Sequence, residues 1–472
     1  MSAVDINGLD QRATARVVLI AAAAALGGFL FGFDTAVING AVDAIRGNFD
    51  LGAGHIGFAV SCALLGSALG AWYAGPLADR LGRVRTMQVA AVLLAVSALG
   101  SGLVHGVWDL IAWRLVGGIG VGMASVIAPT YIAEVSPAQV RGRLGSLQQL
   151  AIVLGIFAAL LSDAFLANTA GGAAKALWLG LEAWRWMFLV AVVPALIYGC
   201  LVLGVPESPR HLVAKGRLAE ARNVLRQVLD LHNESALDHK VTDIQQSLRS
   251  EYRPRLRDLR GPVAGLLPVV WIGILLSVFQ QFVGINVIFY YSSTLWHSVG
   301  FSEADAFTIT VATSIVNVLV TLVAIALVDR IGRKPLLVIG SAGMTVTLGL
   351  MAWCFSQATG TGAALTLPAP WGPVALVAAN AYVVFFGLSW GPMVWVLLGE
   401  MFPNRIRAIA LAVAASAQWL ANFAITSSFP ALAEIGLSFA YGLYALFALL
   451  SLGFVVYAVR ETKGMELEDM RD

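Results

Sequence analysis

Hydrophobic positions along the chain gather into long apolar stretches that are separated by short polar segments. A helix needs about 20 apolar residues to cross the hydrocarbon core of a bilayer. Twelve stretches meet this requirement, in two sets of six that flank one long polar segment between Glu207 and Gly261. The pattern predicts an all-α membrane protein of twelve transmembrane helices, arranged as two six-helix bundles. The predicted spans are residues 17–42, 57–77, 87–105, 110–132, 147–166, 186–205, 265–290, 306–328, 335–355, 373–398, 408–430 and 436–458.

Composition agrees with this pattern and excludes a soluble protein. Hydrophobic residues make up 58% of the chain and charged residues 12%, about half the charged fraction of a soluble domain. Arg12 and Arg16 precede an apolar run as in a signal peptide, but the run continues through Asp34, which favours a membrane helix. No metal or cofactor is expected, because the three cysteines lie in apolar stretches and the six histidines in predicted loops, without metal-ligand spacing.

The polar segment between the two sets predicts a linker with short helices. Residues 218–229 carry apolar positions at helical spacing, which predicts short amphipathic helices on the cytoplasmic side. An independent catalytic module is the alternative, although a separate domain of about 55 residues would be marginally stable. The expected units are an N-terminal bundle (1–205), a linker (206–262), a C-terminal bundle (263–460) and a tail (461–472).

Lys and Arg are unevenly divided between the two sides of the predicted membrane. Of the 30 basic residues, all but Arg46, Lys175, Arg185 and Arg114 lie on the side that holds both termini and the central segment. Basic loops favour the cytoplasmic side, so both termini are expected in the cytoplasm.

The two halves of the chain repeat short charged motifs at matching positions. The offsets between the copies are 250, 266 and 254 residues. Such matches predict a duplicated bundle whose halves are related by an axis along the membrane normal. The matched motifs are Asp79-Arg-Leu-Gly-Arg83 with Asp329-Arg-Ile-Gly-Arg333, Glu134 to Arg141 with Glu400 to Arg407, and Glu207 with Glu461.

These motifs, taken with others, resemble the sugar porter family of the major facilitator superfamily over almost the whole chain. The resemblance points to bacterial proton-coupled hexose and pentose symporters. Arg460 departs from the family, which usually has proline before Glu-Thr-Lys-Gly. The further motifs are Gly-Pro-Leu-Ala-Asp-Arg-Leu-Gly-Arg at 75–83, Pro-Glu-Ser-Pro-Arg at 206–210, Gln-Gln-Phe-Val-Gly-Ile-Asn at 280–286, Trp-Gly-Pro-Met-Val-Trp at 390–395 and Ala-Gln-Trp-Leu-Ala-Asn at 417–422.

The repeated loop charges are candidates for a cytoplasmic gate. Carboxylates and guanidinium groups form bidentate pairs, which could hold the two bundles together when the cytoplasmic side is closed. Solvated charges that only set the topology are the alternative, whereas the resemblance implies a gating role. The candidates are Asp79, Arg83, Glu134, Arg141, Asp329, Arg333, Glu400 and Arg407.

Amide side chains inside the predicted spans are candidates for sugar binding. Amides facing lipid are costly, so they are expected to face an interior. They would either join helices or bind sugar hydroxyls, since each amide can donate and accept. The resemblance implies sugar contacts for Gln149, Gln280, Gln281, Asn286, Asn317, Trp395 and Gln418, and an aromatic pocket of Phe31, Phe386 and Trp419.

Asp34 and Arg114 are taken as the only charges clearly inside the predicted spans. A buried pair is the natural solution to the cost of either charge alone. The pair would be permanent, or Asp34 would titrate, because Arg114 keeps its proton. An aspartate at this position resembles that of proton symporters, whereas passive facilitators usually carry an uncharged residue. Close approach of neighbouring helices is expected at Gly27, Gly28, Gly32 and Gly40.

These features predict a proton–monosaccharide symporter of a bacterial inner membrane that imports a hexose by alternating access. The resemblance favours glucose, with xylose, galactose and myo-inositol left open. The alternatives are a passive uniporter and a non-transporting sensor; a membrane enzyme is disfavoured, because no nucleophile–base arrangement is evident. The expected partners are a monosaccharide, protons and the lipid bilayer, with no nucleic acid, and the chain is expected to act as a monomer.

Overall fold

The computed structural model describes residues 11–136, 141–229, 233–250, 256–359, 366–403 and 406–461, and these residues are almost wholly helical. Twelve helical spans are long and apolar enough to cross a membrane, and each overlaps one predicted stretch. The described residues contain three isolated β bridges and no longer strand. The predicted all-α fold of twelve transmembrane helices is therefore confirmed.

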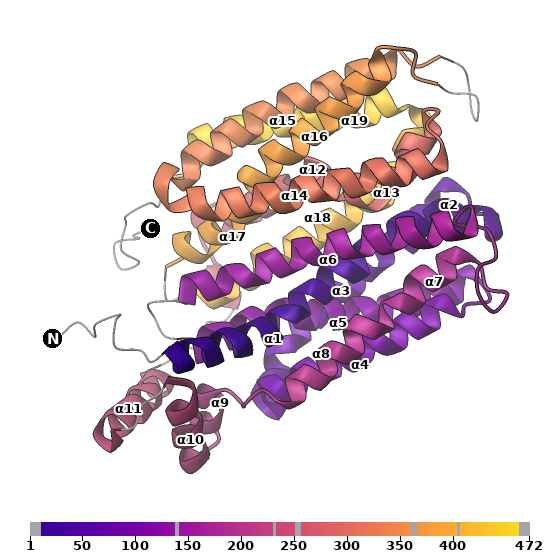
Figure 1. The fold of residues 1–472 in the computed structure, drawn as a ribbon. Coiled ribbons are helices and arrows are strands. Elements are labelled where there is room, and N and C mark those ends of the chain that lie inside the picture. Colours follow the sequence, from indigo (N-terminus) through magenta and orange to yellow (C-terminus); the bar gives the residue numbers. More distant parts are fainter. Residues whose placement is uncertain are drawn as a thin grey trace.

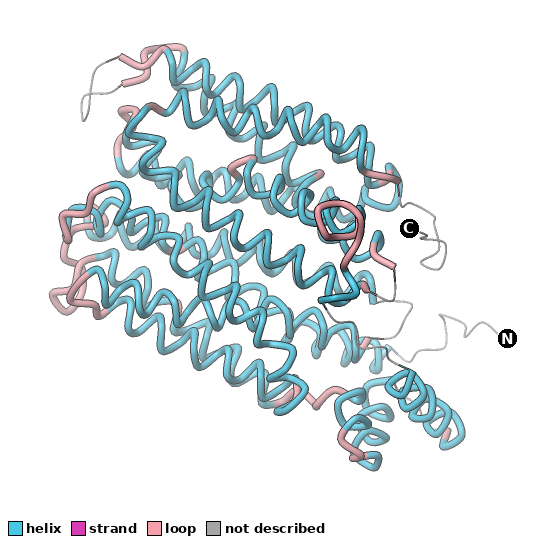
Figure 2. Tube along the Cα trace, turned by 180° about the vertical axis from the view of Figure 1, so that it is seen from behind, coloured by secondary structure: helices cyan, strands magenta, loops and turns pink. Residues whose placement is uncertain are grey.

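The helices pack side by side with loops at both ends of the bundle (Figures 1 and 2). The first half comprises α1 (Gln11–Ala36), α2 (Ile38–Asn48), α3 (Ala53–Leu81), α4 (Arg83–Gly102), α5 (Val107–Val135), α6 (Arg141–Ala170), α7 (Ala183–Val190) and α8 (Val192–Leu203). The central segment forms α9 (Pro209–Ala214), α10 (Leu218–Leu229), α11 (Glu234–Ser250) and the 3-10 helix η2 (Leu256–Leu259). The second half comprises α12 (Pro268–Phe282), α13 (Ile285–Ser298), α14 (Glu303–Ile331), α15 (Arg333–Ser356), α16 (Trp371–Leu388), α17 (Trp390–Met401), α18 (Arg407–Ile435) and α19 (Leu437–Ala458).

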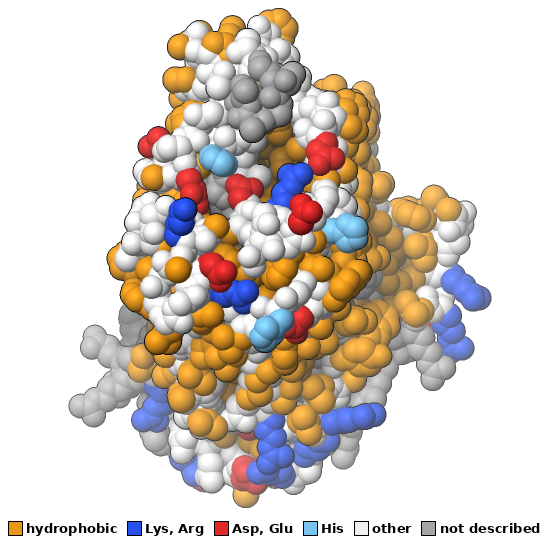
Figure 3. Space-filling view, turned by 90° about the vertical axis from the view of Figure 1, so that its right-hand side faces the viewer, with side chains coloured by type: hydrophobic (Ala, Val, Ile, Leu, Met, Phe, Trp, Pro, Cys, Tyr) orange, Lys and Arg blue, Asp and Glu red, His pale blue; other side chains and the backbone are white. Residues whose placement is uncertain are grey.

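Helices α9, α10 and α11 lie at one end of the bundle together with the start of α1, and we call this the terminal end (Figure 1). The opposite end, with α2 and α7, is called the distal end. Figure 3 faces the distal end, where acidic side chains and histidines are interspersed with few basic ones. This end holds Arg46 on α2, Arg185 on α7 and Lys175 between α6 and α7, the three basic residues predicted to lie on the side opposite the termini.

Four of the described spans are broken into two helices. The breaks fall at Val37 between α1 and α2, at Ala191 between α7 and α8, before Ile285 between α12 and α13, and at Ser389 between α16 and α17. Gly284 has φ +87° at the third break, and a Cβ there would lie 2.7 Å from the ring of Tyr444. Broken spans expose backbone polar groups, so transporters commonly build binding sites beside them.

Glycine allows α1 and α6 to pack at backbone distance. A Cβ on Gly32 would lie 1.9 Å from the carbonyl oxygen of Ile152, and a Cβ on Gly155 would lie 2.0 Å from that of Phe29. No larger side chain fits without separating the helices. A Cβ added to Gly27, Gly28 or Gly40 would lie 2.9, 2.7 or 2.8 Å, respectively, from the nearest atom of a neighbouring helix. The expected close approach is therefore confirmed.

The two halves of the chain are joined at the distal end by polar contacts. Asn39 on α2 donates a 2.9 Å hydrogen bond to the carbonyl oxygen of Phe289 on α13, and the Ser293 hydroxyl donates a 2.8 Å bond to the carbonyl oxygen of Asn39. Arg46 pairs with Glu434 at 3.2 Å. The contact between the two halves is therefore made by α2 and α13, which are the second helices of two broken spans.

Several histidines expected in loops lie in helices instead. His55 is on α3, His211 on α9, His239 on α11 and His297 in the last turn of α13, while His232 lies outside the described residues. The prediction was wrong at His55 and His297 because α3 and α13 continue beyond the apolar stretches, and at His211 and His239 because the central segment forms helices of its own.

Candidate functional site

Gln280, in the last turn of α12, connects three helices of the second half. Its side-chain nitrogen donates to the carbonyl oxygens of Trp390 at 2.9 Å and Gly391 at 3.2 Å, at the start of α17. Its oxygen accepts a 2.6 Å hydrogen bond from the Gln418 amide on α18. The side chain is only 3% exposed, so it holds the α16–α17 break against α12 and α18.

Two further amides extend this network across the α12–α13 break. Gln281 donates to the Gln280 oxygen at 3.3 Å, and Asn286 on α13 donates to the Gln281 oxygen. The buried oxygen of Gln418 has no hydrogen-bond partner in the described residues. A buried acceptor left unpaired costs about 1–3 kcal/mol, and a sugar hydroxyl would satisfy it. We call Gln280, Gln281, Asn286 and Gln418 the amide network.

The structure places the other predicted sugar residues outside this network. Asn317 is a buried residue of α14 that faces α16, because a Cβ on Gly387 would lie 3.7 Å from its side-chain oxygen. Gln149 is half-buried on α6, where no described hydrogen bond joins it to the network. Trp395 on α17 is 45% exposed, and no described ring contact or hydrogen bond links it to the four amides.

The predicted aromatic residues partly assemble. The ring of Phe31 on α1 lies 5.6 Å from that of Trp419 on α18, centroid to centroid, so this pair bridges the two halves. Phe386, at the end of α16, packs on Tyr382 with 6.5 Å between centroids. A Cβ on Gly391 would lie 3.4 Å from the Phe386 ring, which places that ring beside the backbone that Gln280 binds.

Trp390 is a residue of this site that sequence reasoning missed. Its carbonyl oxygen accepts from Gln280, and its indole nitrogen donates a 2.9 Å hydrogen bond to the Ser341 hydroxyl. The ring is fully buried. Trp390 begins one of the motifs quoted above, but only the break at Ser389 reveals that its backbone is available to a side chain.

Asp34 and Arg114 lie side by side inside the first half. Arg114 on α5 donates a 3.1 Å hydrogen bond to the carbonyl oxygen of Asp34, and the same nitrogen lies 3.7 Å from the carboxylate oxygen Oδ2. Asp34 is 9% exposed and Arg114 is 3% exposed. Asp34 Oδ2 makes no described hydrogen bond, so the pair is electrostatic and leaves this oxygen available to a proton.

Tyr290 brings the second half next to this ion pair. Tyr290 belongs to α13, which also carries Asn286, and its hydroxyl contacts the side chains of Thr35 on α1 and Asn422 on α18. Thr35 follows Asp34 directly in the chain. One side chain of α13 therefore touches the residue beside the carboxylate, while another belongs to the amide network.

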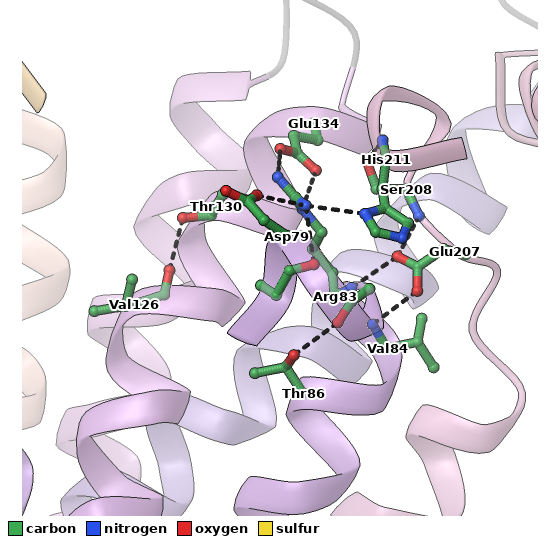
Figure 4. Close-up of polar contacts among 12 residues, drawn as sticks. Asp79, Arg83, Val84, Thr86, Val126, Thr130, Glu134, Glu207, Ser208 and His211 are labelled. Atoms are coloured by element: carbon green, nitrogen blue, oxygen red, sulfur yellow. Dashed lines mark hydrogen bonds and ion pairs between the residues drawn. The ribbon is translucent and has the colours of Figure 1, made fainter. Parts of the chain in front are cut away.

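At the terminal end, the predicted gate charges form ion pairs within the first half (Figure 4). Arg83, the first residue of α4, donates to both carboxylate oxygens of Glu134 on α5, at 3.0 and 2.9 Å. A second ion pair joins Arg83 to Asp79 at 3.3 Å. The His211 ring nitrogen Nδ1 lies 3.3 Å from Arg83, and burial lowers the pKa of His211 below its ordinary value.

Glu207 and Glu461 cap corresponding helices in the two halves. Glu207 accepts from the backbone nitrogens of Arg83 at 2.9 Å and Val84 at 3.3 Å. Glu461 accepts from those of Arg333 at 3.1 Å and Lys334 at 3.0 Å. These nitrogens have no acceptor inside their own helix. The sequence matched the two glutamates by position without revealing this contact.

The second half repeats the side-chain pair as well. Arg333 donates a 2.9 Å hydrogen bond to Glu400, and Arg407 donates to the carbonyl oxygen of Phe402 at 3.1 Å. The side chains of Arg141 and Asp329 lie outside the described part of the structure. The pairs Arg83–Glu134 and Arg333–Glu400 each join helices of one half, and a contact between halves stays a prediction.

Asp163 is an ionisable residue that the sequence analysis overlooked. It belongs to α6 and falls inside the predicted span 147–166, and its side chain is fully buried. The interpretation of Asp34 and Arg114 as the only charges clearly inside the spans is therefore wrong. The residue lies three positions before the predicted end of the span, and α6 continues beyond it to Ala170.

Comparison with known proteins adds to this geometry. The family model described as "Sugar (and other) transporter" matches residues 20–472. The chain is 58% identical to the "Glucose transport protein" of Synechocystis sp., covering 96% of this chain and 97% of that protein. It is 37% identical to the "D-xylose-proton symporter" of Escherichia coli, covering 95% and 93%.

Solved structures of the Escherichia coli xylose transporter XylE are similar to this fold. The partially occluded inward-open conformation gives a TM-score of 0.82 at 35% identity, covering 96% of this chain and 100% of that one. The inward-open conformation gives a TM-score of 0.80.

Proposed function

The chain belongs to the sugar transporter family of the major facilitator superfamily, and on that premise we propose that it is a proton-coupled monosaccharide symporter that imports a hexose. Glucose is the first substrate to consider, because the relative at 58% identity is named as a glucose transport protein. Xylose, galactose and myo-inositol are the alternatives, since a pocket residue or two can change the preference among similar sugars.

The observation that carries the proposal is the distribution of two polar sites between the halves. The amide network lies in the second half, where its unpaired Gln418 oxygen and its aromatic neighbours suit a hydroxylated ring. The buried pair of Asp34 and Arg114 lies in the first half. Tyr290 of α13 connects the surroundings of the two sites. Such a layout allows a proton at one site to influence sugar binding at the other through the conformation of the protein.

Asp34 is the group that exchanges the proton in this mechanism. Arg114 stays charged at any physiological pH. The neutral acid of Asp34 no longer attracts Arg114 as a carboxylate does, so protonation removes the electrostatic part of a contact between α1 and α5. The loaded protein then reopens toward the other side. A proton can shift this equilibrium only by its differential affinity for the two conformations.

The conformation is assigned as open toward the cytoplasm. Hydrogen bonds of Asn39 and the Arg46–Glu434 pair join the halves at the distal end. The excess of basic residues at the terminal end favours the cytoplasm for that end, and inward-open XylE is a structural neighbour. The gate residues of the terminal end would then meet across the halves only in the opposite conformation.

A vesicle experiment tests the proposal. We expect wild-type protein in liposomes to move protons when a sugar gradient is applied, and to accumulate sugar against its gradient when the medium is acidified. Asp34→Asn, with Arg114 intact, should retain sugar exchange and lose accumulation. Accumulation by the variant would refute the coupling role of Asp34, and downhill flux without proton movement in the wild type would establish a uniporter. Binding without flux would instead indicate a sensor.

Competition of labelled glucose uptake by a panel of sugars identifies the substrate. Glucose is expected to compete most strongly, with xylose, galactose and myo-inositol as the other members of the panel. A stronger effect of any other sugar would overturn the assignment of glucose and leave the symport proposal intact.

A further inference from the structure

Asp163 is a carboxyl group that the proposed transport mechanism leaves unused. Its side chain is 0% exposed, in a span that crosses the membrane. Oδ2 accepts a 3.2 Å hydrogen bond from the backbone nitrogen of Gly40, and Oδ1 has no hydrogen-bond partner among the described residues. A charged carboxylate in a membrane interior is costly without a counter-ion.

The N–H group that donates to Asp163 lies at the start of α2. Gly40 is in the first turn of that helix, directly after the break at Val37, so its N–H has no acceptor within α2. A Cβ on Gly40 would lie 2.8 Å from Asp163 Oδ2 and 2.8 Å from the sulfur of Met187. The carboxyl group therefore bonds the backbone just after the break and links α2 to α6.

Helix α2 carries the contact that closes the distal end. Asn39 precedes Gly40 and makes hydrogen bonds with Phe289 and Ser293 of α13. Any movement of α2 away from α13 also moves the Gly40 N–H, because the two residues share a peptide bond. Asp163 is thus connected through one residue to the contact between the two halves.

Charged residues of the surrounding helices are engaged elsewhere and form no described ion pair with Asp163. The helices packed on α6 are α1, α2, α5, α7 and α14. In the membrane interior these helices carry Asp34 and Arg114, which pair together. Toward the distal end they carry Asp43, which lies 3.8 Å from His297; Arg46, which pairs with Glu434; Asp109, which accepts from the His105 nitrogen; Arg185, which pairs with Glu182; Glu303, which accepts from the Ala173 nitrogen; and Asp305, which accepts from Ser302.

From this geometry we propose that Asp163 is a second protonation site, a carboxyl that holds α2 in place while neutral and favours opening of the distal end when ionised. The inference rests on the proposed alternating access and is independent of the role of Asp34. A buried carboxyl without a counter-ion is stable as the neutral acid. Opening of the α2–α13 contact would admit water, which stabilises the carboxylate. Because the closed state holds the proton more firmly, acidic pH favours the closed distal end.

The distance across the distal contact provides the test. Spin labels would be placed at Asn48→Cys on α2 and Ser298→Cys on α13, both exposed, after replacement of the exposed Cys200 by serine. The background carries Asp34→Asn, Asp43→Asn and His297→Gln, which remove the carboxyl group of the ion pair and the titratable pair at the distal contact. Without sugar or a proton gradient, the ratio of open to closed distal ends is measured from about pH 5 to about pH 9.

We expect this ratio to rise with pH, by at most about tenfold per unit for one linked proton. Adding Asp163→Asn should abolish the dependence, since the amide can still accept from Gly40 but cannot ionise. Adding Ser162→Ala is the control and should leave the dependence unchanged, because the Ser162 hydroxyl bonds only its own helix. A ratio independent of pH with Asp163 present, or a dependence that persists in Asp163→Asn, would overturn the proposal.

Infrared difference spectra provide a second measurement that does not require Asp163→Asn to fold. Asp34→Asn protein retains Asp163 as a fully buried carboxyl. A protonated-carboxyl band should be present at acidic pH and fall as the distal end opens. Absence of such a band over the whole pH range would contradict the proposal. Failure of symport in vesicles would leave both readouts unaffected, so the two hypotheses fail separately.

Discussion

Glu207 and Glu461 stand 254 residues apart and bind the first backbone nitrogens of equivalent helices, α4 and α15. Gly82 and Gly332 precede these helices with φ of +99° and +102°. A Cβ at either glycine would lie within 2.8 Å of the glutamate oxygen. The duplication visible in the sequence therefore extends to backbone conformation and to hydrogen bonding at the terminal end.

Removing either carboxylate should destabilise the helix that it caps. Glu207→Ala is expected to lower the free energy of unfolding by about 1–2 kcal/mol, the usual cost of losing a helix cap, with a similar loss for Glu461→Ala. Thermal unfolding in detergent measures the effect. Glu220→Ala is the control, because Glu220 only pairs with Arg217 on the exposed surface of α10. An equal loss in all three variants would refute the capping role.

Gln418→Ala should weaken sugar binding because it removes the amide whose oxygen has no hydrogen-bond partner among the described residues. Loss of one or two hydrogen bonds to a sugar corresponds to about a tenfold or greater rise in Kd. Binding of glucose to purified protein measures the change. Asn380→Ala is the matched control, because that amide bonds only the Leu376 carbonyl oxygen of its own helix. Unchanged affinity in Gln418→Ala would remove Gln418 from the sugar site.

Gly32→Ala should reduce the yield of folded protein strongly. The added methyl would overlap the Ile152 carbonyl oxygen at 1.9 Å, and overpacking of this kind typically costs about 1–3 kcal/mol or more. Gly349→Ala is the control, since nothing lies within 4 Å of a Cβ there, and its thermal midpoint should not fall. If Gly32→Ala matched the wild type both in folded yield by size exclusion and in thermal midpoint, the close packing of α1 on α6 would be contradicted.

His211 should make stability fall as the pH becomes acidic. Burial lowers its pKa, with Glu207 opposing and Arg83 adding to the effect. The contribution to stability is present above the unfolded pKa of about 6.5, and it is lost as the pH falls from there through the lowered pKa of the folded state, where the unfolded chain binds more protons than the folded one. His211→Gln should flatten the difference in thermal midpoint between neutral and acidic buffer. His239→Gln, on the exposed face of α11, should not.

Much of the architecture was readable from the sequence because a bilayer imposes one simple requirement. Each span must hide its backbone in a helix and present an apolar surface, so composition alone locates twelve spans. Charge asymmetry predicts their direction, and the repeated motifs predict the duplication. The motifs that resemble the family contain the residues of the amide network, and the cost of a buried charge in a membrane span pointed to Arg114 as the partner of Asp34.

The tertiary structure decided which of these residues meet. The four amides converge because the α12–α13 and α16–α17 breaks lie side by side, and apolar periodicity does not reveal where a span breaks. Trp395 is half-exposed although its motif predicted a sugar contact. Arg83 and Arg333 bind carboxylates of their own half, since bidentate pairing depends on which helix ends are adjacent. The sequence by itself determined the spans, their duplication and the residue types available for binding a sugar and a proton. Only the packing of the helices could give Asp163 its place at the start of α2, because the cost of a buried charge depends on what surrounds it in space.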